Sequence, residues 1–156
     1  MFSIPKKHLK ILKSLFTKPF TKIEKGGMMP NQFDFFNEDD SVKLEWVSDK
    51  AEKFAKNLSY PNNTAREKGI SSSQLRNFYN EFLRIRDLPK GKEEKFALIK
   101  LLYAKIKYKK TSRPNEIKTD FVNFIKELVN QIGTSEKRFN NACLIMEAIV
   151  GYFPKK

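Results

Sequence analysis

Cysteine, histidine and tryptophan are nearly absent from this sequence, because each occurs once in 156 residues. A single cysteine, Cys143, excludes an intramolecular disulfide and fits a reducing compartment. The single histidine, His8, cannot form a metal site alone, because zinc sites need three or four protein ligands. We therefore interpret Cys143 as a core residue and His8 as an exposed residue of a basic helix.

Catalytic and membrane motifs are also missing. The chain has no serine elbow, no phosphate-binding loop and no cluster with metal-ligand spacing. Its longest apolar runs fall far short of the roughly 18 residues of a membrane span, and its N-terminus lacks the apolar stretch of a signal peptide. The adjacent acids Glu93 and Glu94 favour the positive end of a helix. The sequence thus predicts no enzyme, no cofactor and no membrane span, in a cytoplasmic protein.

Acidic residues are scarce relative to basic ones. The 31 Lys and Arg residues face 18 Asp and Glu, which gives a net charge of +13 and an isoelectric point near 9.8. Residues 1–40 carry +2, so that +11 belongs to residues 41–156. Such an excess repels itself unless a polyanion is nearby, which favours a nucleic-acid partner.

Strand patterns are scarce as well, whereas apolar residues recur at helical spacing from residue 42 onward. With 40% hydrophobic residues the chain can bury a core. We expect an all-α, single-domain bundle of about five helices. They run from Val42 to Leu58, from Ser71–Ser73 to before Pro89, from Glu93 to Lys109, from Ile117 to Ile132, and from Thr134 or Ser135 to before Pro154.

The expected third helix is apolar on two sides. Leu101 and Tyr108 fall opposite Ile99 and Ile106, which belong to the core stripe. Two alternatives follow: the helix is central in the bundle, or its second face joins another subunit.

Residues 1–40 read as an N-terminal extension, and residues 41–156 as a basic helical domain. The extension contains a basic amphipathic stretch, residues 2–20, which could anchor the chain on a membrane surface. Glu24-Lys25-Gly26-Gly27 directly precede two methionines, and a purine-rich ribosome-binding site would encode the same four residues. We therefore hypothesise that natural translation starts at Met28 or Met29. An intact mass of the native protein that begins at Met1 would contradict that hypothesis.

Basic residues lie beside the predicted core faces. Arg76, Asn80 and Arg84 form a polar stripe at spacings of four residues. On the next helix Lys100 and Lys107 flank one edge of the apolar stripe, whereas Lys105 and Lys109 flank the other. Lysines on a helix are often only its solvated face, but few acids stand near these to neutralise them. Their density favours phosphate binding without base reading.

Three segments resemble the small helical subunit of type III-A CRISPR-Cas (Csm) effector complexes. They are Ser72-Ser73-Gln74-Leu75-Arg76, Lys100-Leu101-Leu102-Tyr103-Ala104-Lys105 and Met146-Glu147-Ala148-Ile149-Val150-Gly151-Tyr152. The likeness covers roughly residues 42–154. The chain departs from the family at Ile106-Lys107, where a small residue and an arginine are frequent.

The resemblance implies a non-catalytic subunit that stacks in several copies along guide RNA paired to target RNA, beside the backbone and large subunits. It implies that Arg76, Lys100 and Lys105 face RNA phosphates. Tyr103 matches a family position as well, but we expect its side chain to pack in the core. Charge and spacing add Arg84, Lys107 and Arg138 as RNA-binding candidates. The alternative is a stand-alone DNA-packing protein of the nucleoid type, which should bind duplex DNA tightly by itself.

Overall fold

Five α-helices and one short 3-10 helix make up the regular structure in the computed structural model of the chain, which describes residues 32–61 and 66–155. The elements are η1 (Leu44–Val47), α2 (Asp49–Ser59), α3 (Ser72–Asp87), α4 (Lys92–Ser112), α5 (Thr119–Ile132) and α6 (Glu136–Tyr152). The described residues contain no strand, and an isolated β-bridge joins Phe36 and Val42. The expected all-α bundle of about five helices is confirmed.

The chain divides into two units, Met1–Asp34 and Phe35–Lys156. All the helices above belong to the second unit, which begins at Phe35, whereas the boundary predicted from the sequence follows residue 40. The amphipathic stretch, the alternative start and His8 lie outside the described residues.

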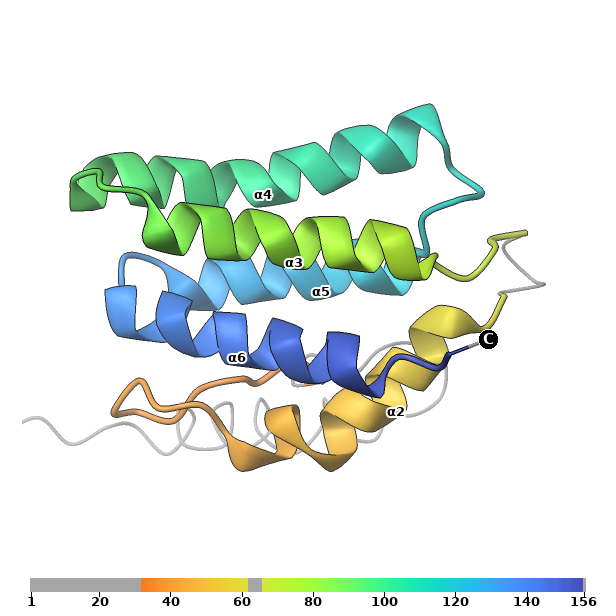
Figure 1. Cartoon of the computed structure of the whole chain (residues 1–156), viewed down its shortest axis with the longest axis horizontal. Coiled ribbons are helices and arrows are strands. Elements are labelled where there is room, and N and C mark those ends of the chain that lie inside the picture. The colour runs from red at the N-terminus through yellow and green to blue at the C-terminus, as the bar shows by residue number, and fades with distance from the viewer. Residues whose placement is uncertain (1–31, 62–65, 156) are drawn as a thin grey trace, which may run out of the picture. The chain divides into compact units, whose positions relative to one another are not determined.

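Helices α3 to α6 run side by side, and α2 crosses this group obliquely next to α6 (Figure 1). Helix α6 packs on α2, α3 and α5, whereas α4 packs mainly on α5 and α3. Helix α4 therefore lies at an edge of the bundle (Figure 1), with one long side that meets no other described helix.

Phenylalanine rings connect the helices through the core. Phe35 lies 4.8 Å from Trp46 and 5.3 Å from Phe124 between ring centroids, and Phe54 stacks on Phe124 at 4.7 Å. Phe121 stacks on Phe124 at 6.2 Å and meets Phe78 of α3 edge to face at 5.4 Å. Aromatic pairs at such distances add about 0.5–1.5 kcal/mol each beyond their area burial. The many phenylalanines thus hold α2, α3 and α5 in one core.

The expected first helix, Val42 to Leu58, is wrong at its start. Val42 is extended and bridges Phe36, and the Lys43 amide donates to the Phe35 carbonyl at 2.8 Å. A 3-10 turn follows, and the backbone of Ser48 breaks it from α2 with φ −136° and ψ −114°. This turn buries Trp46, whereas Val42 and Val47 stay half-buried. Contacts with Phe35 and Phe124 outweigh the local helical pattern.

The starts of α3 and α6 and the end of α5 follow local signals in the sequence. Ser71 forms a capping box with Gln74, in which each side chain accepts from the other residue's backbone amide. Gly133 ends α5 with a left-handed φ of +55°, and the Ser135 hydroxyl accepts from the Arg138 amide to cap α6. These boundaries confirm the predictions.

Two lysines are used inside the fold. Lys118 is 4% exposed and donates its ammonium hydrogens to the Asn57 carbonyl, to Asn57 Oδ1 and to the Tyr60 carbonyl. Lys110 donates to buried Glu67 and to the carbonyls of Pro114 and Ile117. A buried charge needs such partners, so both lysines stabilise the connections around α2 and α5.

Candidate nucleic-acid interface

The predicted polar stripe of α3 lies on the surface. Arg76, Asn80 and Arg84 are all exposed, opposite the buried residues Leu75 and Phe82. Arg76 has no acid partner among the described residues, so its guanidinium keeps its donors for a ligand. The stripe therefore presents one unpaired cation, Arg76, and an amide.

Glu81 joins α3 to α4 through two cations. The Arg84 guanidinium donates to Glu81 Oε2 at 3.0 Å, and the Lys105 ammonium donates to the same oxygen at 3.3 Å. The hydrogen bond from Arg84, followed by that from Lys105, holds the pKa of Glu81 below its ordinary value although burial opposes this. Two positive charges share one negative charge, which leaves this cluster cationic.

Helix α4 is the most basic element. From Lys95 to Ser112 it contains six lysines and no acid. Lys107 lies over the Tyr103 ring at 5.8 Å, and Lys109 lies over the Phe78 ring at 5.2 Å. Lys100 is exposed and has no acid partner in the described residues. Nothing on this helix neutralises its lysines after the first turn.

The lysines of α4 lie on two sides of the helix. Lys100 and Lys107 are seven residues apart and share one edge, whereas Lys105 faces α3 through Glu81. The structure therefore brings Arg84 and Lys105 together and leaves Lys100 and Lys107 on the other edge of the same helix.

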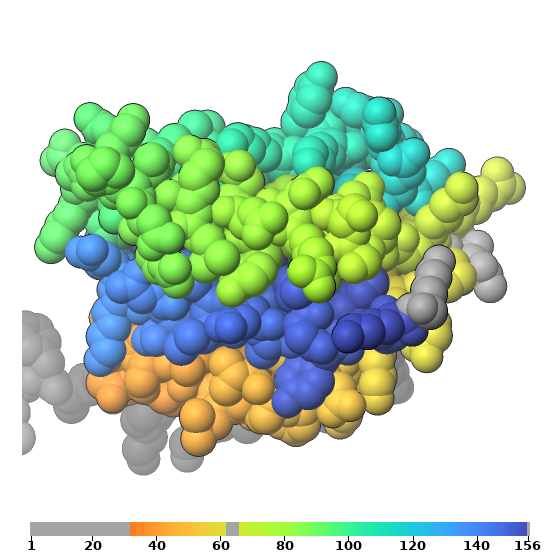
Figure 2. Space-filling model, in the orientation of Figure 1, coloured from red at the N-terminus to blue at the C-terminus, as the bar shows by residue number. Residues whose placement is uncertain are grey.

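A groove of about 660 Å³ runs between α3 and α4. Its apolar residues include Leu101, Ala104 and Tyr108, and its polar residues include Asn77, Asn80 and Lys105. Asn77 is not among the predicted site residues, since only the pairing of the two helices places it in one groove with Tyr108. Figure 2 shows this side of the unit, with α3 in front and α4 along its upper edge.

The second apolar side of α4 is open. Leu101 is 49% exposed and Tyr108 is 73% exposed, so neither side chain is inside the bundle. Of the two alternatives for this helix, a central position is wrong, because α4 lies at the edge with these residues facing outward. Contact of this face with another subunit, the second alternative, stays a prediction.

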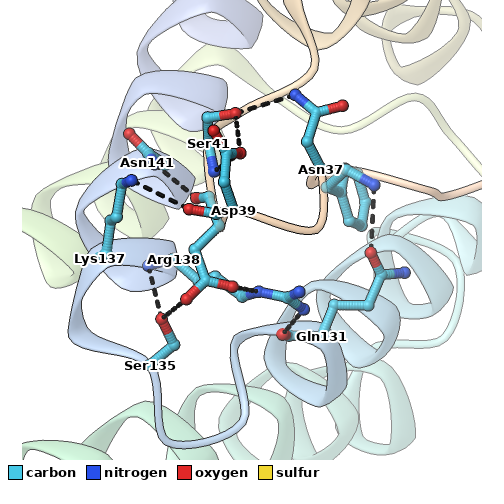
Figure 3. Close-up of polar contacts among 10 residues, drawn as sticks. Asn37, Asp39, Ser41, Gln131, Ser135, Lys137, Arg138 and Asn141 are labelled. Atoms are coloured by element: carbon cyan, nitrogen blue, oxygen red, sulfur yellow. Dashed lines mark hydrogen bonds and ion pairs between the residues drawn. The ribbon is translucent and has the colours of Figure 1, made fainter.

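Arg138 lies apart from the other candidates, at the start of α6. Its Nε donates to Asp40 at 2.6 Å, and its Nη1 donates to the Gln131 carbonyl at 2.8 Å (Figure 3). Its guanidinium also lies over the Phe36 ring, 5.2 Å from the ring centroid. Lys137 and Asn141 bind the backbone of the same loop, at Asp39 and Asp40. The hydrogen bond from Arg138 is the first cause that holds the pKa of Asp40 below its ordinary value. Arg138 thus fastens residues 36–40 to the bundle.

Other chemistry is limited in the described ranges. No group of three His, Cys, Asp or Glu residues could hold a metal ion there. Cys143 is buried, and burial raises the pKa of its thiol to about 11, which disfavours the thiolate that a nucleophile needs. None of the described helices is both long enough and apolar enough to span a bilayer.

Comparison with models of protein families gives a match over most of the chain. The family model described as Csm2 Type III-A matches residues 41–155, which is well over half of the chain and contains α2 to α6. Searches of curated proteins and of solved structures returned no match. The match agrees with the three segments of resemblance, all of which lie inside it. The chain therefore belongs to the Csm2 Type III-A family, the small subunits of type III-A CRISPR-Cas effector complexes.

Proposed function

We propose that this subunit is non-catalytic and binds guide RNA and target RNA electrostatically inside the effector complex, in the cytoplasm. Several copies stack along the paired RNA and contact the backbone and large subunits. The protein holds phosphates, and base pairing between the two RNA strands supplies the sequence information.

The lysines of α4 carry this proposal. After its first turn α4 contains six lysines and no acid of its own, along a helix whose outer side is open. Lys110 is held inside the fold by Glu67, and the other five lysines form a basic surface that a polyanion would neutralise. Each phosphate contact would release counterions bound to the RNA, which is the main source of affinity in sequence-independent binding.

The candidate residues contribute in different ways. Arg76 and Lys100 have no acid partner in the described part of the chain and can bind phosphate without losing a bond. Arg84 and Lys105 both bind Glu81, so the three residues together contribute one net positive charge. Lys107 lies over the Tyr103 ring and has no acid partner among the described residues. A phosphate contact at Arg138 would cost its bonds to Asp40 and Gln131.

Few phosphates per copy are within reach of one such surface, so affinity in the complex would come from several copies bound to one RNA. Linked contacts of this kind raise the overall affinity through effective concentration. The isolated subunit is therefore expected to bind RNA weakly and with a strong dependence on salt.

The test is a salt titration of the full chain with single-stranded RNA. The triple variant Arg76→Ala, Lys100→Ala, Lys105→Ala should flatten the slope of log affinity against log salt by roughly 0.7 for each lost contact. The matched control is Lys53→Ala, Lys56→Ala, Lys126→Ala, which removes the same charge from exposed positions of α2 and α5. Equal slopes for the two variants contradict the assignment of these contacts.

The same titration with duplex DNA tests the DNA-packing alternative. A nucleoid-type protein would bind the duplex more tightly than RNA, and the triple variant would leave the RNA slope unchanged. That pair of results would replace the proposed function.

A further inference from the structure

The groove between α3 and α4 combines three chemistries that a free nucleobase requires. Tyr108 exposes an aromatic ring, Asn77 and Asn80 offer side-chain amides, and Lys105 and Lys109 add positive charge.

The aromatic ring is available to a ligand. Tyr108 is 73% exposed although it lines the groove, and no other described ring stacks on it. A planar base can lie on such a ring, and contacts of this kind are tolerant of sequence because every base has a π-face.

The amides are available as well. Asn77 and Asn80 have no side-chain hydrogen bond with any described residue, and they lie on the α3 wall of the groove. An amide presents two donors and one acceptor oxygen, which match the edge of an unpaired base.

The charge of the groove favours an anionic occupant. Its lining contains one acid, Glu81, which already accepts from Arg84 and Lys105, and Lys109 adds a charge that no described acid neutralises. The volume of about 660 Å³ lies within the roughly 300–1,000 Å³ typical of small-ligand sites. A nucleotide fits this combination of size, aromatic wall and positive charge.

We propose that this groove binds one unpaired base of single-stranded RNA, stacked on Tyr108, with its edge on Asn77 or Asn80 and its phosphates near Lys105 and Lys109. The inference rests on the proposed RNA-binding function and adds a base contact to it. An amphipathic protein segment is the competing occupant, since Leu101 and Ala104 also line the groove. The unpaired amides and the lysine rim favour the nucleotide.

The experiment compares Tyr108→Leu with Tyr108→Phe in the full chain. The probe is a single-stranded RNA of about 15 nucleotides, near the upper site size of single-strand binding modules. Losing one stacked base should weaken binding roughly 5- to 150-fold for Tyr108→Leu, whereas Tyr108→Phe keeps the ring and the affinity. The matched control is Tyr60→Leu, which removes an exposed tyrosine at the end of α2. Its affinity should equal that of the wild type.

The salt slope separates this inference from the proposed function. Tyr108 carries no charge, so Tyr108→Leu should lower the affinity and leave the slope unchanged, and it should have no effect on an RNA duplex of the same length. Unchanged single-strand affinity in Tyr108→Leu overturns the base site. The phosphate-binding proposal survives that result if the triple charge variant still flattens the slope.

Two further results would also overturn the base site. If Tyr108→Leu abolishes assembly with other subunits or copies while RNA affinity is kept, the groove is a protein interface. If the wild-type chain binds no RNA at low salt, the proposed function and the base site fail together.

Discussion

The basic residues of this subunit fall into two groups at the scale of single side chains. Arg76 and Lys100 are exposed and have no described acid partner, whereas Lys110, Lys118 and Arg138 bind groups of the fold itself. A net charge alone therefore overstates the number of cations that RNA can use. The two groups should respond differently to substitution.

Lys118→Met should destabilise the fold. The change leaves two partly buried carbonyls and one amide oxygen without their charged donor, which costs about 1.5–3 kcal/mol in the free energy of unfolding. Urea denaturation measures it. Lys126→Met, at an exposed position of α5, is the control and should change that free energy by less than about 0.5 kcal/mol. Equal effects of the two substitutions contradict the role of Lys118.

Arg138→Ala should lower thermal stability and Arg76→Ala should change RNA binding, each with little effect on the other property. Arg138→Ala removes the bonds to Asp40 and Gln131 and should lower the midpoint of thermal unfolding, with little effect on the salt slope of RNA binding. Arg76→Ala should flatten that slope by roughly 0.7 and leave the midpoint unchanged. A flattened slope in Arg138→Ala would instead place this residue among the RNA contacts.

At the scale of elements, the helix ends that depend on neighbours in sequence could be predicted. Ser71 with Gln74 and Gly133 are local signals, and each lies where α3 begins or α5 ends. The break at Ser48 could not be predicted, because it follows from packing of Trp46 against Phe35 and against Phe124, which comes from a distant part of the chain.

The connection between α2 and α3 depends on a glycine. A Cβ at Gly69 would lie 2.3 Å from the Ser59 carbonyl oxygen, a backbone atom that cannot rotate away. Gly69→Ala should therefore lower the free energy of unfolding by about 1–3 kcal/mol. Gly151→Ala in α6 is the control, because a Cβ there meets nothing within 4 Å and alanine favours a helix by up to about 1 kcal/mol. Thermal unfolding of both variants tests whether Gly69→Ala lowers the stability and Gly151→Ala raises it.

The candidate site was partly predictable from helical spacing. Spacing identified Arg76, Arg84 and Lys105 as surface cations, and all three are exposed. It could not show that Arg84 and Lys105 share Glu81, or that Asn77 and Tyr108 line one groove, because both facts require α3 and α4 to be paired. Spacing also could not show that Asp40 binds Arg138 from nearly a hundred residues away.

At the scale of the whole molecule, the net charge of +13 repels itself, so the stability of the fold depends on the carboxylates that offset this charge. Burial raises the pKa of Glu67, but hydrogen bonds from Lys110 and Thr119 together outweigh it, so the pKa lies below its ordinary value of 4.5. A lowered pKa means that the stabilisation is complete above the ordinary value and is lost as the pH falls through the lowered value.

The stability of wild type should consequently fall as the pH drops below 4.5, and Glu67→Gln should weaken that dependence because the titrating carboxyl is gone. Urea denaturation at a series of pH values measures both. Glu147→Gln, at an exposed position of α6, is the control and should keep the wild-type profile. A Glu67→Gln profile that parallels wild type at every pH contradicts the role of Glu67.

The central claim is that α3 and α4 contact RNA in the effector complex. Ultraviolet crosslinking of the assembled complex with guide and target RNA, followed by mass spectrometry of the attached peptides, tests it most directly. Crosslinks should fall on residues 72–112 of this subunit, with Tyr108 among them, since these residues form the basic surface and the groove. Crosslinks confined to α2 and α5, or none to this subunit, would contradict the account.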